Sequence, residues 1–337
     1  MFEIKLKCRL ISHKLRFRDS IRLQQQRMAQ EIVPPSIVLQ RGLRLVGFTD
    51  NRQSSVRRSK NIERFHTHFG SSPGVYAAMW SDLQTTAVPE ALLTPEDMKK
   101  TCLEHFLMAT HFLKCYSKEN QNEGTFKLCD TTIRKWVWHC VKKIQALKAE
   151  KIVLPQHWNP TESPNANETT FTITVDGIHC RIFEPSHGRY SKNPEHYSHK
   201  FKQAGLGYEI ALSVFENRCV WMNGPFPAGK NDVSIFRSAL KANMKGMGIA
   251  DKGYRGEAAL LSIPTSHDTE QVREFKSRAL ARHEKFNGQL KNFAALSEKF
   301  RHGLEKDQMV EKHQSCFEAV TVICQCQLEN GSPLVVV

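Results

Sequence analysis

The sequence predicts an α/β protein in which a helical region precedes a domain built on a mixed sheet flanked by helices. Apolar residues recur at helical spacing between residues 66 and 155. The stretch TTFTITVDGIHCRIF at residues 169–183 alternates apolar and polar residues at its start, which is typical of a strand. Further segments then follow in the order strand, strand, helix, strand, helix, which indicates an α/β pattern with a mixed sheet.

The length of 337 residues leaves room for about two domains of roughly 100–200 residues each. A Pro- and Asn-rich linker at residues 155–167 separates the part with helical spacing from the part with strand-like alternation. We therefore expect a basic, partly irregular arm over residues 1–65, a helical region over 66–155 and a sheet-containing domain over 156–337.

The composition is that of a globular protein outside the membrane. Hydrophobic residues make up 40% of the chain and charged residues 24%, which is ordinary for a folded domain. No apolar run approaches the roughly 18 residues that a bilayer-spanning helix needs. The N-terminal sequence MFEIKLKCRLISHKLRFRDS lacks the apolar core of a secretory signal. We expect no membrane partner.

The charge is strongly positive and unevenly distributed. The formal net charge is +14, and residues 1–70 hold 15 Lys and Arg against 5 Asp and Glu. A basic arm of this kind can neutralise the phosphates of a nucleic acid. A solvated leader with no nucleic-acid role is the alternative. The stretch RRSK at residues 57–60 also resembles a nuclear import signal, which predicts a nuclear location.

The ten cysteines form no C-x-x-C pair, and the closest two are Cys324 and Cys326. Structural zinc sites usually combine two closely spaced ligand pairs. The pattern therefore predicts free thiols in a reducing compartment.

Residues 1–65 look irregular apart from a helix near residues 15–30, and Pro34-Pro35 interrupts the chain after it. Downstream, Thr94-Pro-Glu-Asp predicts a helix start, with Thr as the cap and acidic residues in the first turn. Apolar residues follow at Met98, Cys102, Phe106, Ala109 and Leu113. A polar break at residues 117–127 is expected to end this helix.

A second long helix is expected to begin with Asp130 as its cap. Its apolar face comprises Ile133, Val137, Cys140, Val141, Ile144 and Leu147, and its basic face comprises Arg134, Lys135, Lys142, Lys143 and Lys148. A capped basic helix after a short turn is typical of a helix-turn-helix, in which one face packs and the other meets DNA. An ordinary solvated basic face is the alternative. Trp136 and Trp138 are expected to be packing residues.

The segments after residue 183 complete the predicted sheet. Residues 207–215 read as the second strand, 216–218 as a turn and 219–222 as the third strand. Asn231-Asp232 is expected to cap a helix to about residue 244. Residues 247–250 form a short strand that ends at Asp251, and a long helix is expected over about 269–299.

Three of these elements carry an acidic residue at a distinctive place. Asp176 lies on the polar face of the first strand, Asp251 closes the fourth strand, and Glu284 lies opposite the apolar stripe of the last helix. Taken singly, each is more often a turn or surface residue. Together they are the ingredients of an RNase H-like nuclease site.

The chemistry explains why carboxylates suit such a site. Mg²⁺ or Mn²⁺ prefers hard oxygen ligands and binds through a few carboxylates together with phosphate oxygens and water. Two ions about 3.5–4 Å apart can clamp the attacking and leaving oxygens of an in-line phosphoryl displacement. The sequence therefore suggests two Mg²⁺ (or Mn²⁺) ions as cofactors.

Several separated blocks then resemble one family. TVDGIHC, GPFPAGKNDVSIFR, IADKGYRG and ARHEKFNGQLKNF…FRHG are similar, in order, to the Harbinger-like superfamily of DDE transposases. The likeness runs from about residue 171 to the C-terminus, including CFEAVTVICQCQLENGSPLVVV. The resemblance implies an RNase H-like catalytic domain over 156–337, and the upstream helices resemble the family's DNA-binding helix-turn-helix more loosely.

The resemblance also assigns roles to residues. It implies that Asp176, Asp251 and Glu284 are the catalytic, metal-binding triad, with the last two 33 positions apart, and that Asp232 supports the site. DNA contacts are expected from Arg134, Lys135, Lys142, Lys143, Lys252, Arg255 and Lys291. His179 and His283 are expected beside the site as supporting or packing residues.

The implied activity is that of a DNA endonuclease and strand transferase acting on transposon ends and target double-stranded DNA. Chemistry at two ends implies a homo-oligomer, and such proteins often use a separate DNA-binding partner protein. A catalytically silent DNA-binding protein derived from a transposase is the alternative, and a nuclease acting on RNA or on other DNA is a third.

Overall fold

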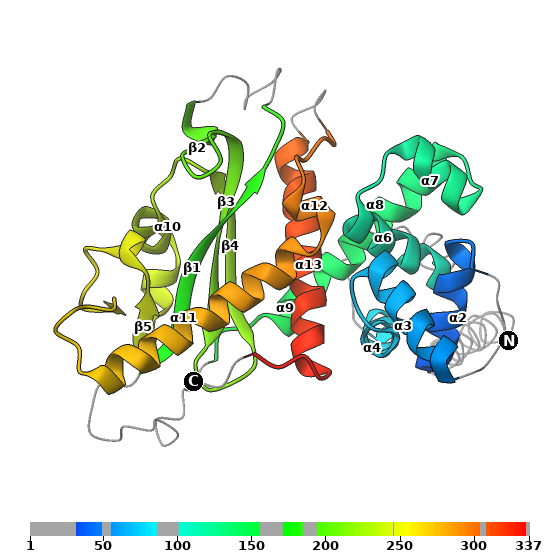
Figure 1. Cartoon of the computed structure of the whole chain (residues 1–337). Helices are drawn as coiled ribbons and strands as arrows, with labels where there is room; N and C mark the ends of the chain where they lie inside the picture. Colours follow the sequence, from blue (N-terminus) through cyan, green and yellow to red (C-terminus); the bar gives the residue numbers. More distant parts are fainter. Residues whose placement is uncertain are drawn as a thin grey trace, which may run out of the picture.

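The structure is a computed structural model, and it describes residues 32–48, 55–85, 101–155, 171–184, 194–244, 246–303 and 308–334. Figure 1 shows a sheet with its covering helices on one side and a group of helices on the other, with helix α13 (Met309–Glu329) between them. The helix predicted near residues 15–30, the start predicted at Thr94 and most of the linker lie outside the described residues.

The sheet is mixed, as the sequence predicted. Its strands are β1 (Phe171–Arg181), β2 (Tyr197–Ser198), β3 (Gln203–Ser213), β4 (Cys219–Pro227), β5 (Met247–Ala250) and β6 (Leu261–Ser262). Strand β3 pairs antiparallel with β1 on one side and with β2 and β4 on the other. Strand β1 pairs in parallel with β5, which pairs in parallel with β6. The prediction of an α/β fold with a mixed sheet is confirmed.

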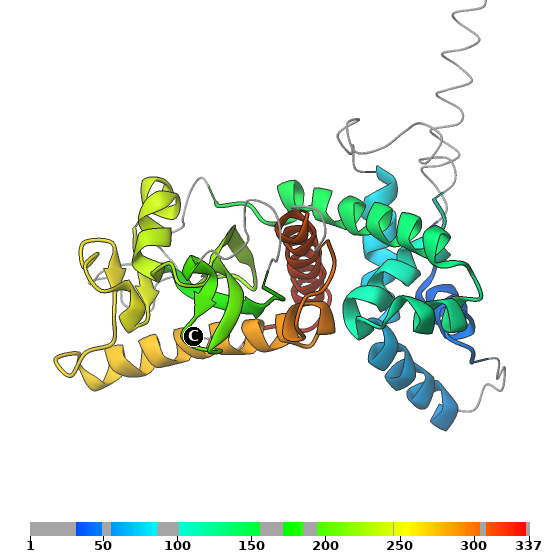
Figure 2. The same ribbon diagram turned by 90° about the horizontal axis from the view of Figure 1, so that it is seen from above.

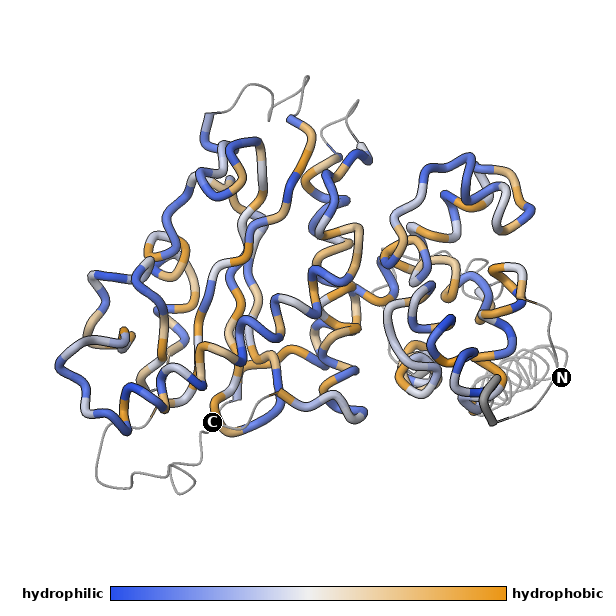
Figure 3. The backbone as a smooth tube through the Cα atoms, viewed as in Figure 1, coloured by the Kyte–Doolittle hydropathy of each residue, from blue (hydrophilic) through white to orange (hydrophobic). Residues whose placement is uncertain are grey.

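The two faces of the sheet are covered by different helices. Alternate residues of β1 point to opposite faces. Ile173 and Val175 pack with Phe236 of α10 (Asp232–Ser238), whereas Ile178 and Cys180 belong to the core that contains Phe286 of α11 (Glu270–Lys291). Figure 2 shows α11 along one face of the sheet and α10 on the opposite side. Figure 3 shows mainly hydrophobic or neutral residues along the central strands and hydrophilic residues in the outer loops.

Several helices precede the sheet. They are α2 (Pro35–Leu45), α3 (Ser55–Phe69), α4 (Pro73–Thr85), α6 (Leu103–Cys115), α7 (Glu119–Phe126), α8 (Asp130–Ala146) and α9 (Lys148–Lys151). The prediction that residues 1–65 are largely irregular is wrong for the described part, because α2 and most of α3 fall within it. Pro35 lies in the first turn of α2, where the missing N–H of proline costs no hydrogen bond, so it begins a helix.

Helix α8 matches its prediction in apolar pattern but not in its cap. All six residues predicted for its apolar face are buried, although the last of them, Leu147, lies just after the helix. Trp136 stacks on His105, with their ring centroids 3.7 Å apart. Cys129 occupies the N-cap, so Asp130 is the first helical residue, where its carboxylate pairs with Arg134 at 2.8 Å. The predicted polar break is also wrong in part, because it contains α7.

The helices after β4 are shorter than predicted. Helix α10 ends at Ser238 and a 3₁₀ turn, Leu240–Asn243, follows it. Helix α11 begins after Thr269, whose hydroxyl accepts a hydrogen bond from the backbone N–H of Val272. It ends at Lys291, and α12 (Ala294–Ser297) follows. No described helix is long and apolar enough to cross a membrane.

Helix α13 is buried around its whole circumference. Every residue from 315 to 328 is buried, including Glu318, Gln325 and Gln327. A helix buried on all sides must be covered by neighbours on all sides, and α13 packs against α8 and α9 on one side and against α11 and β4 on another. It therefore joins the helices that precede the sheet to the sheet itself.

The carboxylate of Glu318 gives a test of this junction. It is 7% exposed and accepts hydrogen bonds from Lys148 Nζ at 2.7 Å and Gln145 Nε2 at 2.8 Å. We expect Glu318→Ala to lower the free energy of unfolding by about 1–3 kcal/mol, because three donors, including Gln314 Nε2 at 3.1 Å, lose their acceptor. The matched control is Glu274→Ala, which removes an exposed i,i+4 pair with Arg278 and is expected to cost about 0.5 kcal/mol or less. Urea denaturation measures both, and equal losses would contradict the prediction.

Candidate carboxylate site

The pairing of β1 with β5 brings two of the predicted acids together. Val175 lies opposite Ala250 in the parallel ladder, so Asp176 and Asp251 occupy the next position on neighbouring strands. Such strands lie about 4.8 Å apart. Strand β5 ends there, and Asp251 is exposed while its Oδ1 accepts a hydrogen bond from the N–H of Gly253 at 2.8 Å. Asp176 is partly buried.

Asp232 enters the same site from the first turn of α10, and two glycines make room for it. A Cβ atom built on Gly177 would lie 2.5 Å from Oδ1 of Asp232. A Cβ atom on Gly253 would lie 2.8 Å from Oδ2 of Asp232 and 3.0 Å from Oδ1 of Asp251. The side chain of Asp232 therefore lies between the glycine that follows Asp176 and the turn that follows Asp251.

The three carboxylates influence one another electrostatically. Burial, and then the charge of Asp251, raise the pKa of Asp176 to about 6. Burial, then Asp251 and then Asp176, raise the pKa of Asp232 to about 6 as well. Among the residues that the structure describes, none of the three forms an ion pair with Lys or Arg. Clustered carboxylates without such a partner are the donor set that a hard divalent cation fits.

Glu284 is placed differently from the other predicted acids. It is exposed on α11, and the side chain of α11 that contacts the site is Asn287, whose Nδ2 donates to Oδ2 of Asp176 at 2.9 Å. Residues three apart on a helix are surface neighbours. Among the acidic residues of α11, Glu284 is therefore the nearest in sequence to Asn287, the residue that contacts Asp176. The structure brings Asp176, Asp232 and Asp251 together and leaves Glu284 one turn away.

A fourth acid, Glu209, lies beneath this cluster and escaped the sequence analysis. It is opposite Gly177 in the β1–β3 ladder and is 1% exposed. Trp221 donates to its Oε1 at 3.1 Å, while Oε2 is buried without a hydrogen-bond partner. Burial raises the pKa of Glu209 to about 7, and the charge of Asp232 adds to the shift. The signal available in the sequence was a single Glu inside the apolar run GYEIALSVF.

One cation borders the carboxylates, and a second lies near His179. Lys200, in the turn between β2 and β3, opposes the upward pKa shifts of Asp176 and Asp232. Burial lowers the pKa of His179, and the charges of Lys200 and Lys291 lower it further. His179 contacts the hydroxyl of Ser198 at 3.0 Å and His283 is buried in α11. Lys291 was among the predicted DNA contacts, whereas Lys200 was not.

The other predicted DNA-contacting residues fall in two places. Lys252 and Arg255 are exposed directly after Asp251. The remaining four lie on α8, where Arg134 pairs with Glu119 at 2.9 Å and with Asp130, and Lys143 Nζ donates to the Thr101 hydroxyl at 3.2 Å. Lys142 is exposed, and Lys135 lies over the ring of Trp136. The basic face of α8 is therefore partly engaged within the protein.

The chain matches no known family profile, and no curated protein and no solved structure shows significant similarity to it.

Gly177→Ala tests the close approach of Asp232. The added methyl group would overlap Oδ1 of Asp232, so the carboxylate must move away from Asp176 and Asp251. We expect Mn²⁺ binding, measured by titration calorimetry, to weaken by about tenfold or more. The matched control is Gly288→Ala, which adds a methyl group where nothing lies within 4 Å and is expected to leave Mn²⁺ binding unchanged. Equal affinities of the two variants would contradict the prediction.

Asp232→Asn tests the mutual repulsion of the carboxylates. The raised pKa values of Asp176 and Asp232 mean that the folded state holds protons more tightly than the unfolded state, so stability falls as pH rises from about 4 to about 6. The variant lacks one of these charges. We expect it to be about 1 kcal/mol more stable than the wild type at pH 7.5, after allowance for solvent screening, and equally stable near pH 3.5.

Urea denaturation at the two pH values measures this difference. The control is Asp130→Asn, which changes a half-buried carboxylate that pairs with Arg134 at the start of α8 and is therefore expected to give no gain in stability at pH 7.5. A stabilisation by Asp232→Asn that persists unchanged at pH 3.5 would show that charge repulsion is not its cause.

Proposed function

We propose that this protein is a metal-dependent DNA endonuclease and strand transferase of the Harbinger-like DDE class. The observation that carries the proposal is the convergence of Asp176, Asp232 and Asp251, which come from β1, α10 and the end of β5. These carboxylates come from separate elements and have no Lys or Arg partner, so their mutual repulsion lowers the stability of the folded protein. Bound divalent ions would offset that repulsion.

The arrangement of the sheet supports an RNase H-like classification of this domain. Three antiparallel strands, β4, β3 and β1, continue into the parallel strands β5 and β6. Helix α11 crosses the face that carries Asp176, which is the placement expected for the helix that supplies the last acid (Figure 2).

Two Mg²⁺ or Mn²⁺ ions would be held by Asp176, Asp251 and Glu284, with Asp232 between the first two. Ions held by these carboxylates would supply Lewis-acid stabilisation for the attacking and leaving oxygens of an in-line displacement. In the proposed reaction, water attacks a phosphodiester at a transposon end. The freed 3′ hydroxyl would then attack a phosphodiester of the target DNA, forming a new P–O bond and releasing the 3′ hydroxyl of the cut target strand.

The cations beside the site have a natural role in this reaction. Lys200, Lys291, Lys252 and Arg255 would steady the phosphates on either side of the bond that is cut. Lys135 and Lys142 of α8 would contact DNA at a distance from the carboxylates. The proposal includes a homo-oligomer, a separate DNA-binding partner protein and a nuclear location. For the last, Arg58 and Lys60 of the RRSK stretch are exposed on α3.

A catalytically silent DNA-binding protein is the second candidate, and one observation favours it. The side chain of α11 that binds Asp176 is the neutral amide of Asn287, while the carboxylate of Glu284 points into solvent. An enzyme requires Glu284 to join the ions when they bind, whereas a DNA-binding scaffold does not.

Nicking of supercoiled plasmid DNA in the presence of Mg²⁺ or Mn²⁺ tests the proposal. We expect the wild type to cut, and Asp251→Asn and Glu284→Gln to cut at least about a hundredfold more slowly, because each removes a carboxylate that stabilises the charged transition state. Glu274→Gln changes an exposed acid on the same helix and is expected to cut like the wild type.

Binding of the same DNA, measured by fluorescence anisotropy, separates the two candidates. Equal DNA binding by wild type and Asp251→Asn together with lost cutting supports the enzyme. Tight, salt-sensitive binding without cutting by any form supports the silent DNA-binding protein and refutes the proposed catalysis.

A further inference from the structure

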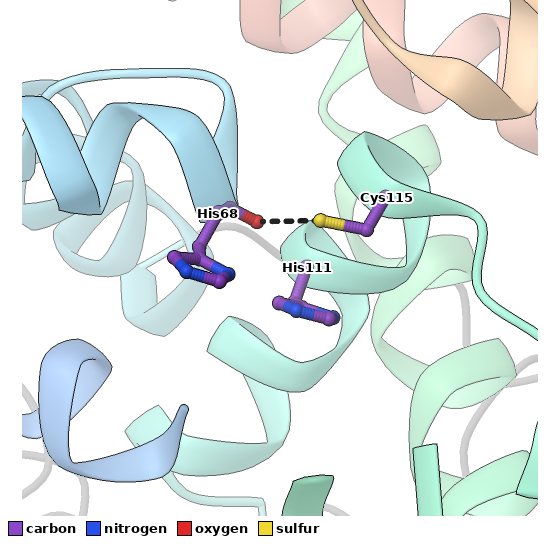
Figure 4. A group of neighbouring side chains, drawn as sticks. All are labelled: His68, His111 and Cys115. Atoms are coloured by element: carbon purple, nitrogen blue, oxygen red, sulfur yellow. Dashed lines mark hydrogen bonds between the residues drawn. The ribbon is translucent and has the colours of Figure 1, made fainter. Parts of the chain in front are cut away.

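Three side chains with soft or borderline metal-ligand atoms meet between helices α3 and α6. His68 comes from α3, and His111 and Cys115 come from α6, where their i,i+4 spacing places them on one face. The two ring nitrogens and the thiol sulfur lie within 4.8 Å of one another. Figure 4 shows the two imidazole rings side by side, with Cys115 directed toward His68.

The local hydrogen bonding leaves this cluster poorly satisfied. His111 is 4% exposed, and its Nδ1 is buried without a hydrogen-bond partner. The thiol of Cys115 donates only to the backbone oxygen of His68, at 3.5 Å. The rings of His68 and His111 are nearly parallel, with their centroids 5.8 Å apart. A buried ring nitrogen without a partner costs free energy that a bound cation would recover.

The protonation of the cluster suits metal binding. Burial, and then the charge of His68, lower the pKa of His111 to about 4, and burial lowers the pKa of His68 as well. A neutral imidazole offers a lone pair that a metal ion can accept. Burial raises the pKa of the Cys115 thiol, so the thiol proton must leave when a metal binds.

We propose that His68, His111 and Cys115 bind one Zn²⁺ ion, with a water molecule as the fourth ligand. Zn²⁺ takes imidazole nitrogen at about 2.0–2.1 Å and thiolate sulfur at about 2.3 Å in a tetrahedral arrangement. Ligand atoms of a tetrahedral ion with such bonds lie closer together than the 4.8 Å within which these three atoms lie, so the side chains would have to close around the ion. The Cys115 proton passes to solvent, and the charge on the metal stabilises the thiolate.

This site is distinct from the carboxylate site in place and in chemistry. It lies among the helices that precede the sheet, on the far side of α13 from β1 (Figure 1). Its nitrogen and sulfur ligands favour Zn²⁺ over Mg²⁺, whereas the carboxylates favour the reverse. A bound ion would link α3 to α6 through His68 and Cys115, which are 47 positions apart in the sequence. The inference does not rest on the proposed nuclease activity.

Co²⁺ substitution in the full chain tests the site without reference to activity. We expect the metal-free protein to bind one Co²⁺ with thiolate charge-transfer absorption in the near ultraviolet and visible bands typical of a tetrahedral ion. Zn²⁺ should displace the Co²⁺ with an affinity tighter than about 1 μM. Cys115→Ser and the more exposed His68→Gln should each weaken binding by about tenfold or more, and Cys115→Ser should abolish the charge-transfer band.

Two controls locate the ion. Cys129→Ser alters an exposed thiol outside the cluster, and Asp251→Asn alters the carboxylate site, so neither should change the Co²⁺ spectrum. Failure of the folded wild type to bind Co²⁺ or Zn²⁺ would overturn the inference. So would an unchanged spectrum in Cys115→Ser, because the sulfur would then not be a ligand.

Discussion

The burial of α13 on every side is the constraint on which the arrangement of this protein depends. A helix with no solvent-facing stripe must have its polar side chains satisfied by the elements around it. Gln325 accepts a hydrogen bond from the N–H of Cys219 in β4, and Gln327 donates to the backbone oxygen of Gly70 beside α3. His313 meets the hydroxyl of Tyr208 in β3 at 2.7 Å. These partners lie on different sides of α13, so the helix fixes the sheet and the preceding helices in one relative position.

A scaffold fixed in this way can tolerate the local cost of the carboxylate cluster. Asp176 and Asp232 are held partly buried near Asp251, where their ionised forms repel one another, and Glu209 lies beneath them in the sheet. Each group lowers the stability of the folded chain at neutral pH. The ladder of β1 with β3 and β5, and the core on both faces of the sheet, must offset this loss. Sites that destabilise the fold in this manner are typical of function rather than of structure.

The molecule also separates two kinds of ligand atoms. The carboxylate oxygens of Asp176, Asp232 and Asp251 lie where the pairing of β1 with β5 ends. The ring nitrogens and the thiol sulfur of the His68, His111 and Cys115 cluster lie between α3 and α6. Because hard and soft ligands prefer different ions, the two places would not compete for the same metal. The described cysteines are free thiols, as the cysteine spacing predicted, and the proposed Zn²⁺ site would use Cys115 with two histidines rather than closely spaced ligand pairs.

The sequence by itself determined the elements whose signals are local. Alternation predicted β1, the four apolar and small residues before Asp251 predicted β5, and Thr269 marked the start of α11. These signals depend on residues within one turn or one strand of each other, so they survive without tertiary information. The same locality placed Asp176 and Asp251 at positions from which their side chains could meet. Glu284 was correctly predicted to face away from the apolar stripe of its helix.

Only the tertiary structure decided which side chains meet. That Asn287 contacts Asp176, that Glu209 lies opposite Gly177, and that Arg134 is paired with Glu119 all follow from contacts between distant parts of the chain. The pattern of α2 was hidden because a proline reads as an interruption until it is known to occupy a first helical turn. Burial of one helix face can be inferred from periodicity, whereas partners across a core depend on packing that no local window contains.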